Sequence, residues 1–238
     1  MHVSFQLLQN FRDPELCKGL LDKLHALVDA PFRFMEVCGT HTVAIFQSGL
    51  RSLLPKDVIH LSGPGCPVCV THEAEVNAFL DLAGMDKVRI ATFGDLMRVP
   101  GHRGRNLKNA TSEGARVSVV YSPMDALKLA ADRPDEEVVF LGVGFETTAP
   151  TVAATVLMAQ AQGLKNFSVL SFHKLVPPAL EVLLNDEGVA IDAFVLPGHV
   201  SAIIGMPPYA PIAAKYRKSA AVTGFEPVDI LQSLLFLV

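Results

Sequence analysis

Two stretches decide how this chain folds: FRFMEVCGTHT at residues 32–42 and VIHLSGPGCPVC at residues 58–69. In each stretch an apolar run ends in a glycine-containing turn, and an apolar-periodic segment follows. This pattern predicts a buried parallel strand, a tight turn and a covering helix. Because the carboxyl ends of parallel strands line the ligand crevice of an open α/β sheet, we expect Cys38, His41, Cys66 and Cys69 to gather at such an edge.

Strand and helix patterns alternate along the rest of the chain. The apolar runs lack clear alternation, which is typical of strands in sheets that are covered on both faces. We expect strands near residues 32–37, 58–62, 88–92, 117–121, 137–143, 167–171, 191–196 and 219–224. Helices are expected in most of the gaps, for example at residues 15–27, 43–54, 73–83, 152–162 and 179–185. The fold class is therefore α/β.

The chain also repeats itself at a nearly constant offset. Residues 36–42 resemble residues 142–148, residues 88–95 resemble residues 192–199, and residues 122–127 resemble residues 226–231. A common offset at three places indicates a duplication. We therefore predict two pseudo-symmetric three-layer α/β domains with mainly parallel sheets around a central cleft. Residues 1–121 would carry the cysteine motifs, and residues 122–238 would carry the matching loop at residues 144–150.

Composition narrows the class of protein. Half of the 238 residues are apolar and 18% are charged, which suggests extensive burial or a sizeable partner surface. No apolar run reaches the length of a membrane span, and the N-terminus lacks a signal-peptide layout. The net charge of −4 and the scattered basic residues do not favour nucleic acid. Four cysteines in a chain of this size suit a cytoplasmic protein with metal-binding or redox cysteines.

The cysteines and the histidine each allow two interpretations. Cys66 and Cys69 form a C-x-x-C motif, which suits a redox dithiol or two ligands of one metal, or else two small residues in a tight turn. Cys38 is either a thiolate favoured by the following helix N-terminus and by His41, or a small buried hydrophobe. His41 is a ligand, a proton donor or a thiolate partner, or it is merely exposed beside a capping Thr40.

Polar residues beside these groups complete the candidate site. Thr40 and Thr42 flank His41, and Glu146, Thr147 and Thr148 occupy the matching loop of the second half. The hydroxyls could donate hydrogen bonds to a bound ligand, or they could simply cap the helices that follow.

Together these motifs resemble the signatures of a known family. FMEVCGTHT at residues 34–42, GPGCPVC at 63–69 and GFETTAP at 144–150 resemble the HypD family of hydrogenase maturation proteins. Residues 91–95, 171–178, 197–200 and 224–227 support the resemblance, which runs from about residue 11 to the last residue. It implies a scaffold that assembles the Fe(CN)2CO centre of [NiFe]-hydrogenases. The implied partners are a small chaperone, HypC, and the cyanide donor HypE.

The resemblance also implies residue roles. Cys38 would be an iron ligand shared with a cysteine of HypC, and Cys66 and Cys69 would form a redox-active dithiol. His41, Thr40 and Glu146 would line the site. Thiolates suit low-spin iron with strong-field ligands, hydroxyls such as that of Thr147 can donate to cyanide, and a dithiol can supply two electrons.

Family members continue into a smaller domain whose cysteines hold a [4Fe-4S] cluster. These 238 residues have no cysteine after Cys69, so we expect no such cluster here. The apolar helix that starts at Pro227 lacks the usual stop signals and looks truncated. We expect it to pack on the N-terminal helix or to self-associate.

Two other functions fit parts of the sequence. One is a thiol–disulfide oxidoreductase that uses Cys66 and Cys69, which would need neither Cys38 nor the second-half loop. The other is a cysteine-nucleophile enzyme built on Cys38 and His41, for which no orienting group or oxyanion device is identifiable. The leading interpretation is an assembly scaffold with possible redox activity rather than a turnover enzyme.

Overall fold

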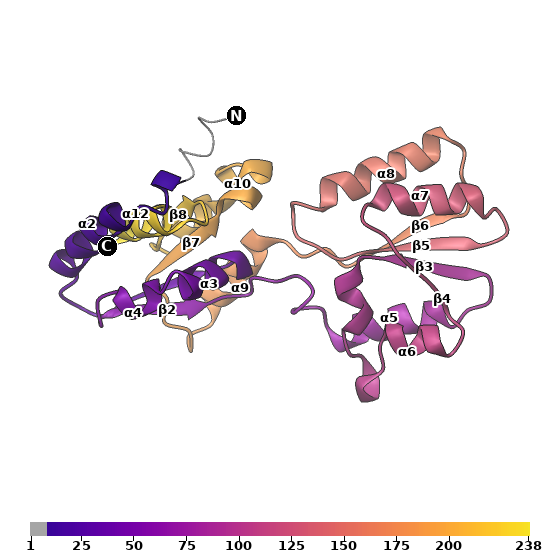
Figure 1. Ribbon diagram of the computed structural model, residues 1–238, viewed down its shortest axis with the longest axis horizontal. Coiled ribbons are helices and arrows are strands. Elements are labelled where there is room, and N and C mark those ends of the chain that lie inside the picture. Colours follow the sequence, from indigo (N-terminus) through magenta and orange to yellow (C-terminus); the bar gives the residue numbers. More distant parts are fainter. Residues whose placement is uncertain (1–8) are drawn as a thin grey trace. The chain divides into compact units, whose positions relative to one another are not determined.

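A computed structural model describes residues 9–238 of the chain (Figure 1). Within these residues, eight strands form two separate four-stranded sheets in which every pairing is parallel. The chain divides into two compact units, and each sheet belongs to one of them. The predicted α/β class is therefore confirmed. The expected cleft between the domains stays a prediction.

Unit 1 contains the chain up to Cys66 together with Val176–Val238. Its sheet has the strand order β2-β1-β7-β8. Its helices and strands are α2 (Pro14–Leu27), β1 (Phe32–Glu36), α3 (Gly39–Gln47), α4 (Leu50–Leu53), β2 (Val58–Ser62), α9 (Val176–Asn185), β7 (Ala193–Pro197), α10 (Gly198–Ile204), η3 (Pro207–Tyr209), α11 (Ala210–Ala214), β8 (Ser219–Thr223) and α12 (Pro227–Leu237).

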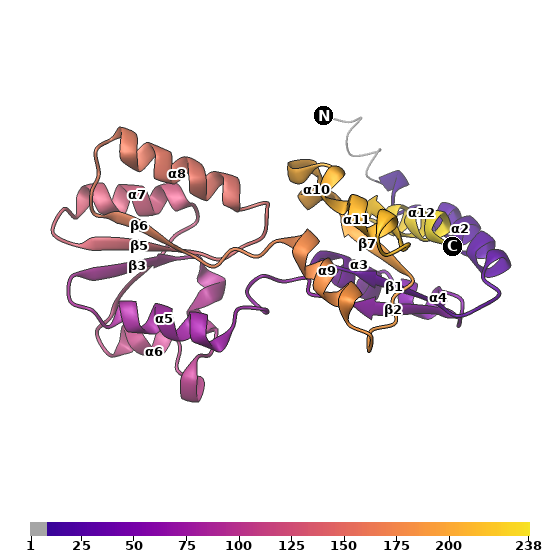
Figure 2. The same ribbon diagram turned by 180° about the vertical axis from the view of Figure 1, so that it is seen from behind.

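Unit 2 spans Pro67–Leu175, and its sheet has the order β4-β3-β5-β6. Figures 1 and 2 show α7 and α8 on one face of this sheet and α5 and α6 on the other. The elements are α5 (Glu73–Ala83), β3 (Val88–Thr92), η1 (Gly94–Arg98), η2 (His102–Gly104), α6 (Leu107–Ser112), β4 (Arg116–Val119), α7 (Pro123–Asp132), β5 (Glu137–Gly142), α8 (Ala149–Ala161) and β6 (Phe167–Ser171).

The two units do not follow the division after residue 121 that the repeat suggests. In unit 1, strands β1 and β2 of the first half share a sheet with β7 and β8 of the second half, and β1 pairs directly with β7. Strands β3 to β6, which lie between β2 and β7 in the sequence, form the other sheet. The repeat matches β1 with β5, β2 with β6, β3 with β7 and β4 with β8. Exchanging each strand of the first sheet for its match gives β6-β5-β3-β4, which is the order of the second sheet in reverse. The duplication is therefore visible in the topology, but each unit combines pieces of both halves. A repeat marks duplicated segments and does not say which strands pair.

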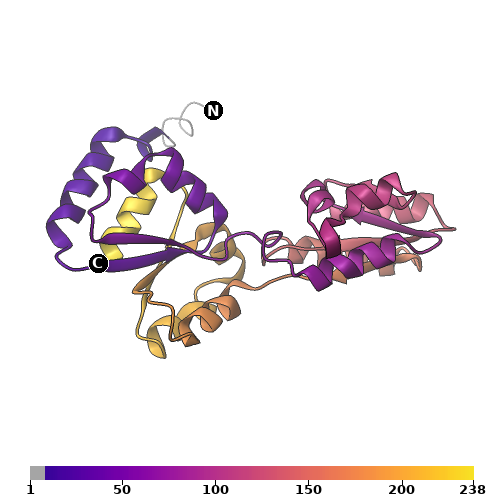
Figure 3. The same cartoon turned by 90° about the horizontal axis from the view of Figure 1, so that it is seen from below.

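Apolar cores fill the space between the sheets and their helices. In unit 1, Figure 3 shows α2, α3 and α12 over one face of the sheet, where Leu24, Ile45 and Leu234 pack with Phe34 and Val195 of the strands. In unit 2, one core joins α5 and α6 to the sheet and another joins α7 and α8 to its opposite face. Both units thus have the three layers predicted from the sequence.

The last helix packs where the sequence analysis expects it. Ile230, Leu231, Leu234 and Leu237 of α12 are buried in the same core as Leu21 of α2. Among residues 9–238, no helix has the length and apolar character needed to cross a membrane.

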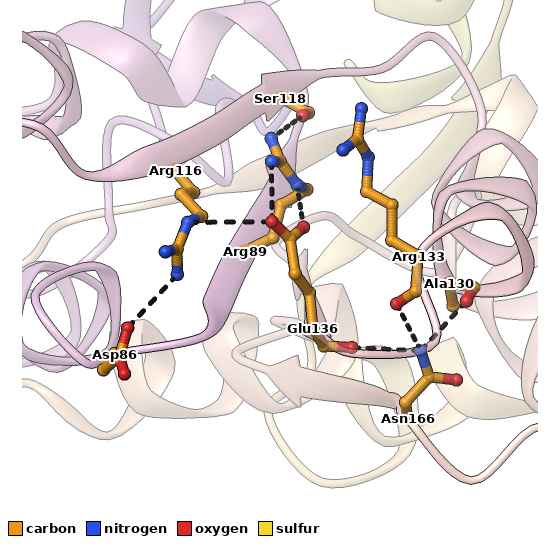
Figure 4. A network of polar contacts seen from close by, with 8 residues as sticks. All are labelled: Asp86, Arg89, Arg116, Ser118, Ala130, Arg133, Glu136 and Asn166. Carbon is orange, nitrogen blue, oxygen red and sulfur yellow. Dashed lines mark hydrogen bonds and ion pairs between the residues drawn. The ribbon is translucent and has the colours of Figure 1, made fainter.

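A polar network ties together the amino ends of the unit 2 strands (Figure 4). The guanidinium of Arg89 donates to both carboxylate oxygens of Glu136, at 2.5 and 3.1 Å. Nε of Arg116 lies 3.6 Å from the same carboxylate, and Nδ2 of Asn166 is 3.0 Å from the main-chain oxygen of Glu136. The hydrogen bonds from Arg89 hold the pKa of Glu136 below its ordinary value.

Candidate functional site

The loop between β1 and α3 presents Cys38 at the carboxyl end of the unit 1 sheet. Cys38 is extended (φ −148°, ψ 123°) and occupies the N-cap position of α3. Its carbonyl accepts the main-chain N–H of His41 at 2.8 Å, which closes the first turn of the helix. The residue is only 7% exposed. Its side chain makes no capping hydrogen bond to the helix.

The glycine loop after β2 lies directly against the Cys38 loop. The N–H of Gly39 donates to the carbonyl of Gly65 at 3.0 Å, and the N–H of Gly63 donates to that of Glu36 at 2.8 Å. A Cβ on Gly65 would lie 2.4 Å from the nitrogen of Gly39 and 2.7 Å from the carbonyl carbon of Cys38. Only glycine therefore permits this approach. The expected meeting of the two motifs is found within unit 1.

The C-x-x-C motif straddles the two units. Cys66 is the last residue of the first segment of unit 1, and Cys69 lies in the turn that opens unit 2. The main-chain N–H of Thr71 donates to Val68 at 3.2 Å, and its hydroxyl donates to Pro67 at 3.0 Å. These bonds close the turn that carries Cys69. Whether Cys69 joins Cys38 at one edge stays a prediction.

Glu36 is a site residue that the sequence analysis did not single out. It is the last residue of β1 and is fully buried. Its carboxylate accepts the main-chain N–H of Cys38 at 3.0 Å and the hydroxyl of Thr42 at 2.6 Å. Nε2 of His60 lies 3.5 Å from the same carboxylate. The signal that could have identified Glu36 is an acid flanked by the apolar residues Met35 and Val37 at the end of a strand.

The pKa of Glu36 results from opposing effects. Burial raises it, and the contacts from His60, Thr42, the amide of Cys38 and Ser62 lower it. The contacts outweigh burial, so the pKa of Glu36 lies below its ordinary value and the carboxylate is ionised at neutral pH.

His41 is buried and links two loops of the unit 1 sheet. Its Nε2 lies 2.8 Å from the carbonyl oxygen of Gly224, which can only accept, so Nε2 carries the proton and donates it. Burial lowers the pKa of His41. The contact with Gly224 and the charge of Glu36 raise it by less and His199 lowers it, so the pKa lies below its ordinary value. The ring is therefore neutral, and within residues 9–238 its Nδ1 has no hydrogen-bond partner. The ring centroids of His41 and Phe225 are 4.6 Å apart. The interpretation of His41 as an exposed residue is wrong.

The matching loop of unit 2 is arranged differently. Glu146 is 5% exposed. The hydroxyl of Thr148 donates to the carbonyl of Phe145 at 3.0 Å rather than capping α8. On the neighbouring strand end, Ser171 and Nδ1 of His173 are 2.8 Å apart, and burial lowers the pKa of His173. These groups lie at the carboxyl edge of their own sheet.

Metal binding by the side chains of one chain needs several donors close together. In the described part of the chain, no three His, Cys, Asp or Glu side chains are grouped so that they could hold an ion. Cys38 stands as one potential donor, with His41 nearby in the same helical turn.

Comparison with known proteins identifies the family. Residues 15–238 match the HypD family model, described as the hydrogenase formation hypA family. The chain therefore belongs to this family of hydrogenase formation proteins, and the resemblance seen in its motifs is confirmed.

Several curated relatives carry matching names. The chain is 47% identical over 234 residues to the hydrogenase maturation factor HypD of Rhodobacter capsulatus, covering 95% of this chain and 62% of the relative. It is 44% identical over 240 residues to HypD of Escherichia coli (strain K12), covering 98% and 64%. It is 41% identical over 230 residues to a putative hydrogenase expression/formation protein of Methanocaldococcus jannaschii, covering 96% and 63%. The chain thus spans less than two thirds of the length of these relatives.

Proposed function

We propose that this chain is a scaffold on which iron receives its cyanide and carbonyl ligands for [NiFe]-hydrogenases. The observation that carries the proposal is the Cys38 loop. The buried Cys38 follows a parallel strand and occupies the N-cap of α3, and its loop is hydrogen-bonded through the main chain of Gly39 to the glycine loop that leads to Cys66. Membership of a hydrogenase formation family supports the proposal.

In this proposal Cys38 supplies one thiolate to the iron, which is the cargo of the scaffold. Cyanide and carbon monoxide fill other positions, and a cysteine of a HypC-type chaperone supplies a second thiolate. A HypE-type protein delivers the cyanide. Soft thiolates suit iron in this ligand environment.

The surrounding residues would act on the ligands and on the electrons. Thr42 and Thr148 already donate their single hydroxyl protons to Glu36 and Phe145. We therefore assign donation to the diatomic ligands to Thr40 and Thr147, and a supporting place to Glu146. Oxidation of Cys66 and Cys69 to a disulfide would release two electrons and two protons for assembly.

Substitution of Cys38 tests the proposal. Cys38→Ala should abolish iron retention by the anaerobically purified complex with the HypC-type chaperone, because the thiolate donor is lost. The free energy of unfolding should change by no more than about 1–2 kcal/mol, the common range for one substitution. Iron content and infrared cyanide bands are the measurements.

Cys17→Ala is the matched control. Cys17 lies in α2 against the unit 1 core, and burial, followed by Asp13, raises the pKa of its thiol. The Cys17 variant should keep its iron. Undiminished iron with cyanide bands in the Cys38 variant would refute the proposal. If the unsubstituted protein holds no iron in its chaperone complex but its Cys66–Cys69 dithiol still exchanges, the oxidoreductase function is favoured instead.

A further inference from the structure

Glu36 is a fully buried carboxylate that the proposed chemistry does not use. Taking a charged group out of water costs free energy unless hydrogen bonds replace its hydration. In this strand the neighbouring Phe34 is a core residue, so an apolar side chain would be the ordinary choice at such a depth.

The partners of Glu36 lie in the Cys38 loop, in the first turn of α3, on β2 and in the glycine loop. One oxygen accepts the hydroxyl of Thr42 at 2.6 Å, and the other accepts the main-chain N–H of Cys38 at 3.0 Å. Its main-chain oxygen accepts the N–H of Gly63 at 2.8 Å. Ser62, its register partner on β2, also bonds to the carboxylate. One residue therefore connects the Cys38 loop, the first turn of α3 and the glycine loop.

We propose that Glu36 is a positioning residue for Cys38: its two carboxylate oxygens fix the main chain of Cys38 and the first turn of α3, so that the thiol meets iron in one orientation. This inference rests on the proposed function, since it assumes that iron binds at Cys38.

A purely stabilising role explains the arrangement less well. A buried charge can often be replaced by an apolar side chain of similar size without loss of stability. The geometric role needs two acceptor oxygens at once, because the amide of Cys38 and the hydroxyl of Thr42 are both donors. Glutamine offers one acceptor oxygen and places an NH2 group against the second donor. Methionine has no acceptor oxygen for either donor.

Four variants of the full chain, each in its anaerobic complex with the chaperone, separate the two roles. Glu36→Gln and Glu36→Met remove one or both acceptors, Thr42→Val removes the hydroxyl, and Thr42→Ser keeps it. We expect iron retention to fall about 10- to 100-fold in the Glu36 variants, as is common when a partner of a metal ligand is lost. Thr42→Val should also lose iron, and Thr42→Ser should recover it.

Two further measurements make the test decisive. Hydrogen exchange at the Cys38 amide should speed up in the Glu36 variants, and the infrared bands of the remaining bound cyanide should shift or broaden. Iron loss only in proportion to the unfolded fraction, with unchanged bands, would overturn the inference and leave Glu36 a structural residue. Iron retained by Cys38→Ala would overturn the proposed function, and this inference with it.

Discussion

The approach of Gly65 to the Cys38 loop is a contact that only one residue type allows. Backbone atoms surround the place where a Cβ would sit, and backbone atoms cannot move aside as a flexible side chain can. The geometry of the thiol loop therefore depends on a residue that carries no chemistry of its own.

Gly65→Ala should therefore destabilise unit 1 by about 1–3 kcal/mol, the usual cost of overpacking, and should reduce iron retention because the Cys38 loop shifts. Gly19→Ala is the control, since Gly19 lies in α2 with nothing within 4 Å of a Cβ. It should stabilise the helix by up to about 1 kcal/mol. Urea unfolding and iron content measure both effects. Equal behaviour of the two variants would contradict the steric argument.

Residue types made some site residues predictable and left others hidden. Cys38 and His41 stand out because thiols and imidazoles after a strand indicate chemistry. Glu36 does not, because its role depends on Thr42, six residues further along in the first turn of α3, and on Ser62 across the β1–β2 register. The buried state of His41 likewise depends on Gly224, which is far along the chain.

The elements themselves were largely predictable. All eight expected strands are found within about two residues of their expected ends, because buried parallel strands are apolar on both faces. The expected helix at residues 43–54 is instead split into α3 and α4, and α3 begins at Gly39. Gly49 between them has a φ of 72°, a left-handed conformation that ends a helix.

Helix α12 illustrates how burial differs along one element. Leu234 is fully buried in the core with α2, whereas Phe236 is 83% exposed. Leu234→Ala should lower the free energy of unfolding by about 2–5 kcal/mol, because it leaves a cavity. Phe236→Ala should change it by no more than about 0.5 kcal/mol. Chemical denaturation of both variants provides the comparison, and a larger loss for Phe236 would contradict the packing of α12.

The network of Figure 4 makes the stability of unit 2 depend on pH. Because the folded pKa of Glu136 is lowered, its ion pairs stabilise the fold above the ordinary glutamate pKa of about 4.3. This contribution disappears as pH falls through the lower folded value.

Glu136→Gln should therefore cost about 1 kcal/mol at pH 7 and flatten the loss of stability below about pH 4.3. Denaturant unfolding from pH 7 to pH 3 measures the effect. The control is Glu113→Gln, which removes an exposed pairing with Arg105 and should matter little. An equally steep acid transition in the Glu136 variant would argue against the network.

The pairing of β1 with β7 is what sequence patterns could not reveal. Local patterns identify strands, but the order within a sheet depends on which apolar faces meet in three dimensions. The repeat indicated the duplication and suggested a boundary at residue 121. The actual units exchange strands between the halves.

The contiguous unit 2 should fold when produced alone. Residues 67–175 contain a complete sheet with a core on each face, so we expect cooperative thermal unfolding and a native-like circular dichroism spectrum. Residues 1–66 alone should stay unfolded, since β1 lacks β7, and should fold only when residues 176–238 are supplied. A non-cooperative 67–175 fragment would show that unit 2 needs its neighbour.

The interleaved topology has a consequence for how the protein is made. A ribosome releases a chain from its N-terminus, so the segment with Cys38 emerges before unit 2 and before β7 and β8. Its sheet cannot close until β7 and β8 have been synthesised, more than a hundred residues later. During that interval unit 2 can already fold, whereas β1 and β2 have neither β7 nor β8 to complete their sheet. Within residues 9–238, the thiol loop is therefore translated before unit 2, yet it belongs to the unit whose sheet is completed after unit 2. The proposed binding of iron at Cys38 would have to wait for that completion.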